Sequence, residues 1–158
     1  LMGGGLETDE IPELIHIAHC EGFRVMTHTN GADRIKAALE AGADSIEHGY
    51  FGDDECIRLF AETGALWVPT LAATAGFIGR AGFGEGVAQA NVDDQKRMLA
   101  KAAAAGVLIA AGSDAGAFGV SPSAGIITEH RLLSEAGIGE DLIARGDAAV
   151  RERFVYGL

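Results

Sequence analysis

The chain has 158 residues, 48% of them hydrophobic and 22% charged, so it can form one domain with a buried core and is too apolar to be disordered. Its net charge of -11 argues against a nucleic-acid or acidic-membrane partner, because both bind basic surfaces. The two cysteines, Cys20 and Cys56, fit free thiols of a reducing, cytoplasmic compartment, and no apolar run is long enough to span a bilayer.

The first residues, Leu1 to Leu6, have the pattern of a strand end running into a glycine loop. A helix is expected next, because Pro12 suits a first helical turn, and it should end before Gly22. Arg24 to His28 is then predicted to be a short strand.

Two further helix–strand units follow with the same layout. The first pairs a helix over Ala32 to Ala41 with a strand over Asp44 to His48. The second pairs a helix over Asp53 to Thr63 with a strand over Ala65 to Pro69. Residues Thr74 to Gly86 hold five glycines and little periodicity, which predicts an irregular loop over a site.

The last third of the chain returns to regular elements. A helix is expected over Val92 to Ala105, followed by a strand over Val107 to Ala111, whose apolar run is typical of a parallel strand buried on both faces. Another helix is expected over Ile126 to Ala136. Glu140 to Phe154 has the pattern of a terminal helical pair broken near Gly146.

Alternation of helix and short strand is typical of a parallel sheet with right-handed crossovers. Two architectures fit, an open doubly wound sheet and a closed (β/α)8 TIM barrel. The open sheet usually carries a phosphate-binding glycine fingerprint, and the glycines at 3 to 5 are too few for one. A barrel places functional groups at the C-terminal ends of several strands, where His28, His48 and Asp114 are expected, so the α/β barrel is favoured.

His28, His48 and Asp114 form a candidate metal centre. Equivalent strand ends converge on the mouth of a barrel, so these side chains should meet although they are far apart in the sequence. Two imidazoles and a carboxylate suit Zn²⁺ or a similar divalent ion. Such an ion would acidify water, and the aspartate would take or return its proton.

Four segments together resemble the amidohydrolase superfamily, especially its prolidase-like and imidazolonepropionase-like branches. They come in family order at family spacing: VMTHTNG (25–31), ADSIEHG (43–49), WVPTLAAT (67–74) and IAAGSDAG (109–116). By this resemblance, His28 matches the metal-binding histidine of barrel strand 5 and His48 that of strand 6. Asp114 matches the strand 8 aspartate, which contacts metal and acts as general base. The resemblance implies one or two divalent ions, most simply zinc, and hydrolysis of a C–N bond by metal-activated water.

The sequence also departs from this family. Members have a His-x-His pair on strand 1 and, often, a carboxylated lysine on strand 4, and neither is present here. The resemblance therefore covers the C-terminal half of a barrel, roughly strands 5 to 8 with their helices and the end of strand 4, as one domain over residues 1–158. Such a half-barrel would leave unpaired edges at residues 24–28 and 107–111. We expect a partner that closes the barrel, either the missing N-terminal half or a second copy of the chain.

Asn30, Tyr50 and Thr70 end or follow strands and are candidate substrate-binding residues, with loop capping or packing as the alternative. Asn30 stands where prolidase-like relatives often have an aromatic or other substrate-contacting group, so the dipeptide pattern is not fully matched. Glu47 is expected to point to the helical layer, away from the site. The other histidines are expected to have surface or packing roles: His16, His19 and His130.

Three interpretations of function stay open. The first is part of a metal-dependent amidohydrolase that cleaves a dipeptide, an N-acyl amino acid or a cyclic amide. The second is a deaminase of the same superfamily that releases ammonia from a cyclic amidine. The third is an inactive, truncated half-barrel that folds through self-association.

Overall fold

The computed structural model of the chain describes residues 5–80, 82, 84 and 86–154. The strand end expected at the start of the chain falls mostly on residues 1–4, outside this described part. Across the described residues, no helix has the length and apolarity to cross a bilayer.

Three short parallel strands form the sheet, in the order β1 (Met26–Thr29), β2 (Ser45–His48) and β3 (Leu66–Val68). Met26 lies opposite Ser45, and Ser45 lies opposite Leu66, so the C-terminal ends of the strands meet at one edge. Every connection between these strands contains a helix, as parallel pairing requires. The predicted α/β class is confirmed.

The helices cover most of the rest of the chain. Within the described residues they are α1 (Ile11–Cys20), α2 (Ala32–Glu40), α3 (Asp54–Thr63), α4 (Leu71–Ala75), α5 (Val87–Ala104), α6 (Gly125–Glu135) and α7 (Glu140–Phe154). Helix α5 begins at Val87, ahead of the predicted Val92, and its first turns are supported by a 2.8 Å hydrogen bond from Gln89 to Asp93. The first two residues of the loop expected over Thr74 to Gly86 belong to α4 instead, because the apolar run before them packs as a short helix.

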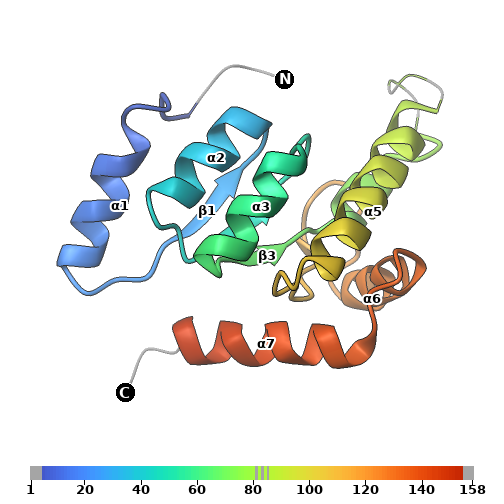
Figure 1. The fold of residues 1–158 in the computed structure, drawn as a ribbon. Helices are drawn as coiled ribbons and strands as arrows, with labels where there is room; N and C mark the ends of the chain where they lie inside the picture. The colour runs from blue at the N-terminus through green and yellow to red at the C-terminus, as the bar shows by residue number, and fades with distance from the viewer. Residues whose placement is uncertain (1–4, 81, 83, 85, 155–158) are drawn as a thin grey trace.

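Helices α2 and α3 lie over the strands in Figure 1, with α5 on the far side of α3, and the core lies between these helices and the strands. Ile46 of β2 and Trp67 of β3 point into this layer and are almost fully buried. The ring of Phe60 from α3 stacks on Trp67, with 5.3 Å between ring centroids. Burial of these apolar side chains is what holds the helices on the sheet.

Glu47 lies on the other face of the sheet, so its predicted position toward the helices is wrong. Side chains alternate along a strand, and Ile46 already occupies the helical side. Glu47 instead accepts a hydrogen bond from the Ser45 hydroxyl on the opposite face. Burial raises the pKa of Glu47, and the Ser45 hydrogen bond only partly offsets this. The same face leaves Met26 47% exposed on the edge strand β1.

The strand predicted over Val107 to Ala111 is reduced to one bridge, between Trp67 and Ile109. Trp67 N–H donates to the Leu108 carbonyl at 2.9 Å, and Ala110 N–H donates to the Trp67 carbonyl at 3.0 Å. The ladder to β3 stops there because the next N–H would have to come from Pro69, which has none, and the Pro69 carbonyl accepts a hydrogen bond from Gln95. On the other edge of this segment, Ala111 N–H donates to the carboxylate of Asp147 in α7.

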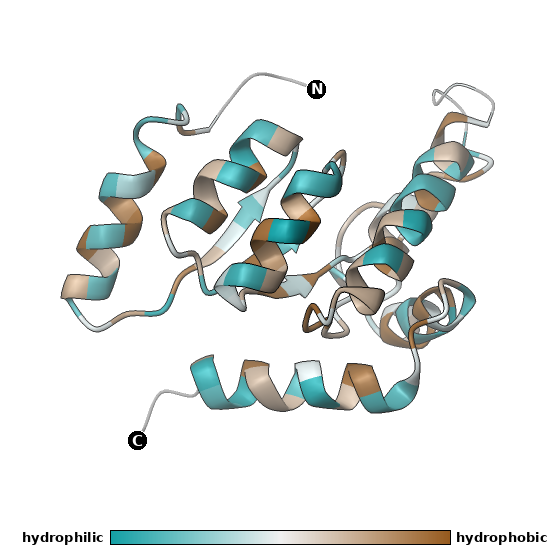
Figure 2. Ribbon diagram, viewed as in Figure 1, coloured by the Kyte–Doolittle hydropathy of each residue, from teal (hydrophilic) through white to brown (hydrophobic). Residues whose placement is uncertain are grey.

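Helix α7 runs unbroken through Gly146, so the predicted break there is wrong. It lies across the lower end of the fold in Figure 1, and hydrophobic and hydrophilic bands alternate along it in Figure 2. Gly146 is needed for close approach, since a Cβ there would lie 2.1 Å from the Ile109 carbonyl oxygen. Near the C-terminal end of α7, Arg153 donates to the carbonyls of Asp44 and Gly64, which precede β2 and β3.

Asp44 ties α1 and the start of β1 to β2. Its carboxylate accepts hydrogen bonds from the Val25 amide, the His19 ring and the Arg24 guanidinium, at 2.9 to 3.0 Å. Burial alone would raise the pKa of Asp44, but these three donors outweigh it and lower the pKa. His19 therefore has the packing role expected from its place on a helix.

Candidate functional site

Three of the predicted site residues have strained backbones at the C-terminal edge of the sheet. His48, Thr70 and Asp114 have φ angles of 69°, 50° and 53°, in the left-handed region that side chains other than glycine rarely adopt. Phe51 is the one other such non-glycine residue within the described part of the chain. Strain of this kind persists where the surrounding structure imposes it, and it is frequent at functional sites.

His28 and His48 meet at the ends of neighbouring strands, as the sequence predicts. Nε2 of His48 lies 2.7 Å from Nδ1 of His28, and the two rings are nearly perpendicular at 77°. His28 is exposed, whereas His48 is buried. An exposed and a buried imidazole therefore face each other through one ring nitrogen each.

The other ring nitrogen of His48 is held by Thr70. Nδ1 of His48 lies 2.6 Å from Oγ1 of Thr70, and the Tyr50 hydroxyl lies 2.8 Å from the same oxygen and 3.0 Å from the Thr70 carbonyl. These distances allow Nδ1–H to donate to Thr70, Thr70 to donate to Tyr50, and Tyr50 to donate to the carbonyl. That set of donors leaves the lone pair of His48 on Nε2, which faces His28.

Asn30 and Tyr50 have partners inside the protein as well. Oδ1 of Asn30 accepts a 2.9 Å hydrogen bond from the Tyr50 amide, so the loop after β1 and the loop after β2 are joined at the site. Burial raises the pKa of Tyr50, although the Thr70 hydrogen bond lowers it, and the phenol stays protonated near neutral pH. The structure thus gives Asn30, Tyr50 and Thr70 a supporting role beside the histidines.

His48 is biased toward its neutral form. Burial lowers its pKa most, and the charge of the neighbouring His28 lowers it further. Asp114 acts in the opposite direction, which indicates that its carboxylate lies within electrostatic reach of His48. A neutral imidazole is the form that binds a metal ion or accepts a proton.

A cavity of about 410 Å³ opens beside the histidine pair. Five of the six predicted site residues line it: His28, Asn30, His48, Tyr50 and Asp114. The sixth, Thr70, touches the cavity wall through its hydrogen bonds to His48 and Tyr50. The predicted residues therefore lie around one cavity, with His28, His48, Thr70 and Tyr50 in hydrogen-bond contact and Asp114 on its wall.

Three residues of the site are missing from the set that the sequence predicts. Trp67 donates from Nε1 to the His48 carbonyl at 2.9 Å, and Gln95 of α5 donates to the Pro69 carbonyl at 2.7 Å. Both fix the strand ends that carry the site. Glu129 of α6 is the third. No local pattern marks a glutamine or glutamate inside a helix as functional, so the sequence offers no signal for these two.

Glu129 is fully buried and holds the first turn of α4. Its carboxylate accepts hydrogen bonds from the Leu71 amide at 3.0 Å and the Ala72 amide at 2.7 Å, directly after the strained Thr70. Burial raises the pKa of Glu129 to about 7, although the two amide hydrogen bonds lower it. Glu129 therefore supports the Thr70 backbone from outside the cavity.

The raised pKa of Glu129 predicts a pH-dependent stability. An ordinary glutamate has a pKa of 4.5, so between about 4.5 and 7 the folded chain binds more protons at this site than the unfolded chain. The contribution of Glu129 to the free energy of unfolding is expected to fall by roughly 3 kcal/mol as the pH rises through this window, and then to level off.

Urea denaturation across this pH range measures the effect, with Glu129→Gln as the comparison because glutamine does not titrate. The difference between the two pH profiles isolates Glu129 from the other titrating groups. Parallel profiles would contradict the assignment.

The histidine pair fits part of a divalent-metal site. Two nitrogens bound to one tetrahedral zinc ion lie roughly 3.3 Å apart, so the 2.7 Å pair would need to open by about 0.6 Å. Nδ1 of His48 already has a hydrogen-bond partner in Thr70, as the second nitrogen of a metal-bound histidine usually has. Within the described residues, no group of three or more His, Cys, Asp or Glu side chains is arranged to hold a metal ion.

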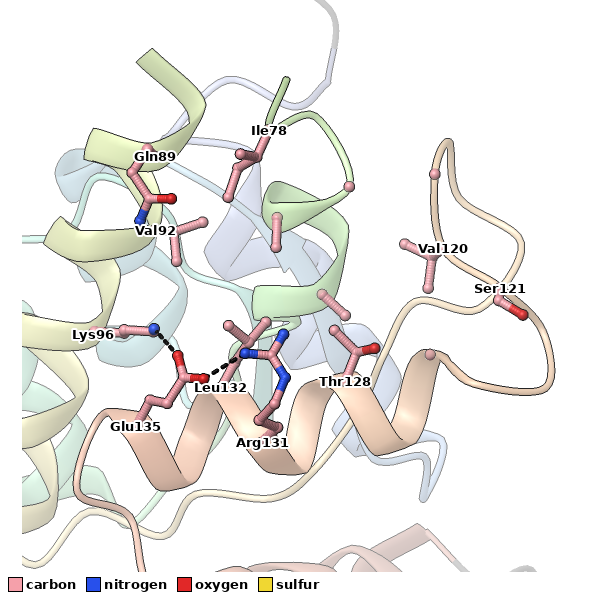
Figure 3. Close-up of a pocket in the computed structure, with 15 residues that line it drawn as sticks. Ile78, Gln89, Val92, Lys96, Val120, Ser121, Thr128, Arg131, Leu132 and Glu135 are labelled. Atoms are coloured by element: carbon pink, nitrogen blue, oxygen red, sulfur yellow. Dashed lines mark hydrogen bonds and ion pairs between the residues drawn. The ribbon is translucent and has the colours of Figure 1, made fainter. Parts of the chain in front are cut away.

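A second cavity, also of about 410 Å³, lies on the other side of α4, between α4, α5 and α6 (Figure 3). Its charged groups are Lys96, Arg131 and Glu135, and Glu135 pairs with the other two. The remaining lining is mostly small or aliphatic. None of the predicted site residues lies in this cavity.

Comparisons with known proteins find relatives that match about two thirds of the chain. No family model matches the chain. An uncharacterized protein of Mycobacterium tuberculosis is 37% identical over 114 residues, 68% of this chain and 31% of that protein. Ochratoxinase of Aspergillus niger is 33% identical over 113 residues, 67% of this chain and 23% of that protein.

Solved structures give the same result. A Xaa-Pro dipeptidase with methionine bound in its active site has a TM-score of 0.66 and 31% identity, covering 86% of this chain and 34% of its own. The structure of A. niger ochratoxinase has a TM-score of 0.71 and 28% identity, covering 94% of this chain and 32% of its own. The chain thus spans about a third or less of the length of these relatives.

The relatives that the chain resembles in sequence and in fold include a Xaa-Pro dipeptidase and ochratoxinase, which are hydrolases. The chain belongs to the amidohydrolase superfamily.

Proposed function

We propose that the chain carries part of the active site of a metal-dependent amidohydrolase that cleaves a C–N bond. The observation that supports this most is the histidine pair at the ends of adjacent parallel strands, with Thr70 on the far nitrogen of His48. His28 and His48 would hold a divalent ion, most simply zinc. Such an ion supplies a Lewis acid, which lowers the pKa of water and polarises a carbonyl oxygen.

The chain's own residues have distinct roles in this proposal. Asp114 is an exposed carboxylate on the wall of the same cavity, and it takes a proton from the attacking water and returns it to the leaving nitrogen. Thr70 fixes the tautomer of His48, and Tyr50 in turn fixes Thr70. Asn30 and Tyr50 border the cavity and would contact the substrate there.

In the proposed complete barrel, β1 and β2 correspond to strands 5 and 6, β3 to strand 7, and the bridge at Ile109 to strand 8. Residues 1–158 would then be its C-terminal half. The further metal ligands and the pairing partner of the β1 edge would come from an N-terminal half or from a second copy of the chain.

The relatives and the cavity together support one substrate class. One neighbour is named for Xaa-Pro dipeptides, and a second was crystallised with N-methylphosphonate-L-proline. The cavity next to the histidines is large enough for a small amide and is lined by several aromatic rings. We therefore assign the site a dipeptide or N-acyl amino acid.

The test is amine release from Xaa-Pro dipeptides and N-acyl amino acids by the purified protein, with its native mass and zinc content measured on the same fractions. We expect hydrolysis that needs zinc and stops when a chelator removes it. This activity should occur in fractions whose native mass shows a second copy or an additional half that completes the barrel. Asp114→Asn is the matched variant, expected to keep zinc and lose hydrolysis. Zinc-loaded fractions that contain the completing half, as an N-terminal half or a second copy, and still release no amine from any of these substrates would contradict the proposal.

A further inference from the structure

The second cavity, between α4, α5 and α6, has a cationic end (Figure 3). Its volume of about 410 Å³ is in the range of small-molecule sites. Lys96 and Arg131 point toward the Glu135 carboxylate at this end, and these three are the only charged groups among the described residues of the lining. Two cations and one carboxylate leave a surplus of one positive charge, in a chain whose net charge is -11.

Glu135 uses only part of the hydrogen-bonding capacity of the two cations. Its carboxylate accepts one hydrogen bond from Lys96, at 2.5 Å, and one from Arg131. Neither cation has another hydrogen bond or ion pair within the part of the chain that the structure describes. An ammonium has three N–H groups and a guanidinium has five, so most of these donors are left over. The hydrogen bonds from Lys96 and then Arg131 lower the pKa of Glu135, so its carboxylate is charged at neutral pH.

Apolar side chains form another section of the wall and come from the three helices and the loops next to them. They are Ala72, Ala75, Ile78, Val92, Val120 and Leu132. Ile78 is 42% exposed, so a ligand that covers it removes apolar surface from water. Inorganic phosphate would bring more negative charge than the surplus here balances and has no apolar part to cover these side chains. A single carboxylate on an apolar body matches both sections of the cavity.

We propose that this cavity binds a small organic monocarboxylate with an apolar body. The carboxylate of the ligand accepts hydrogen bonds from Lys96 and Arg131, and its body lies against the apolar section. Charge-assisted hydrogen bonds of this kind are about twice as strong as neutral ones, so the carboxylate supplies most of the selectivity. The inference does not depend on the proposed function, because His28, His48 and Asp114 line the other cavity.

Calorimetric titration with two matched probes tests this inference. Hydrocinnamate and hydrocinnamamide have nearly the same shape, but only the first carries a negative charge. A chelator is present throughout, so no metal ion at the histidine pair can bind the carboxylate. We expect hydrocinnamate to bind the wild-type chain about tenfold more tightly than the amide.

Three variants locate the binding. Lys96→Met removes one cation but keeps an unbranched apolar side chain, and it should lower the affinity for hydrocinnamate to about that for the amide. Lys101→Met is the matched control, because Lys101 lies on the same helix, pairs with Asp54 and lines neither cavity, and both affinities should stay within about twofold. Glu135→Gln removes the carboxylate that competes for the same donors, so it should raise the affinity for hydrocinnamate by about threefold or more.

Thermal unfolding of each variant without probe checks that it folds, and the opposite effects expected of Lys96→Met and Glu135→Gln keep the test decisive if one of them does not. Four results would each overturn the proposal: no binding of either probe, equal affinities in the wild-type chain, a preference for hydrocinnamate that survives Lys96→Met, or weaker binding of hydrocinnamate to Glu135→Gln. An equal loss of the preference in Lys101→Met would also overturn it, since the effect would then come from the overall charge.

Discussion

Replacing Gly146 with alanine is expected to lower the free energy of unfolding by roughly 4 kcal/mol, the largest stability effect that we predict for a single methyl group. The new Cβ would lie 2.1 Å from the Ile109 carbonyl oxygen and 2.8 Å from the Ala110 nitrogen. These are backbone atoms next to the bridge to Trp67, so neither can move without breaking the pairing with β3. The better helix propensity of alanine recovers only about 1 kcal/mol.

Urea denaturation measures this loss, and Gly139→Ala is the matched control. Gly139 stands just before α7, its φ is not positive, and an added Cβ would meet nothing within 4 Å. Its carbonyl accepts the first hydrogen bond of α7, from Ile143 N–H, and alanine is a poorer N-cap than glycine, so we expect this control to cost at most about 1 kcal/mol. If the two variants were equally stable, α7 would not pack on Ile109 as described.

Replacing His48 with alanine is expected to weaken zinc binding by about 100-fold or more, if the histidines hold the ion as proposed. The chain by itself is expected to bind zinc only weakly, because His28 and His48 supply part of a ligand set. Thr70→Val keeps the shape of the side chain but removes the oxygen 2.6 Å from Nδ1 of His48, and it should weaken zinc binding by about tenfold.

Calorimetric titration with zinc compares these variants with His16→Ala. His16 lies on exposed helix α1 near Cys20, away from the strand ends, so its loss should leave this binding unchanged. An unchanged zinc affinity in His48→Ala, or tight stoichiometric binding that depends on His16 instead, would show that the strand-end pair is not the metal site.

Glu129 and Gln95 explain why the strained backbone at the site persists. Thr70 has a φ of 50°, and the residues after it are held by the Glu129 carboxylate from α6. The residue before it, Pro69, gives its carbonyl to Gln95 from α5. Two helices distant in sequence thus fix the turn that points the Thr70 hydroxyl at His48.

Local sequence patterns are enough to predict the order of helices and strands, the parallel sheet and the residues at its C-terminal edge. These features follow from local physics, because glycine ends a helix, apolar runs of four or five residues form strands, and parallel strands all end at one edge. For the same reason the amino-acid sequence alone groups His28, His48 and Asp114, which line one cavity. Their use in metal binding remains a prediction.

Features that depend on neighbours distant in the chain are visible only in the folded molecule. Gly146 has the sequence pattern of a helix break, but the helix continues and the glycine is there because α7 packs closely on the Ile109 carbonyl. The apolar run at 107–111 has the pattern of a strand, and its pairing with β3 ends after one bridge because Pro69 has no N–H and its carbonyl accepts from Gln95. Gln95 and Glu129 look like ordinary helix residues, and their roles come from burial against carbonyls and amides of another segment. Periodicity records which side of an element is buried, but not which atoms it meets there.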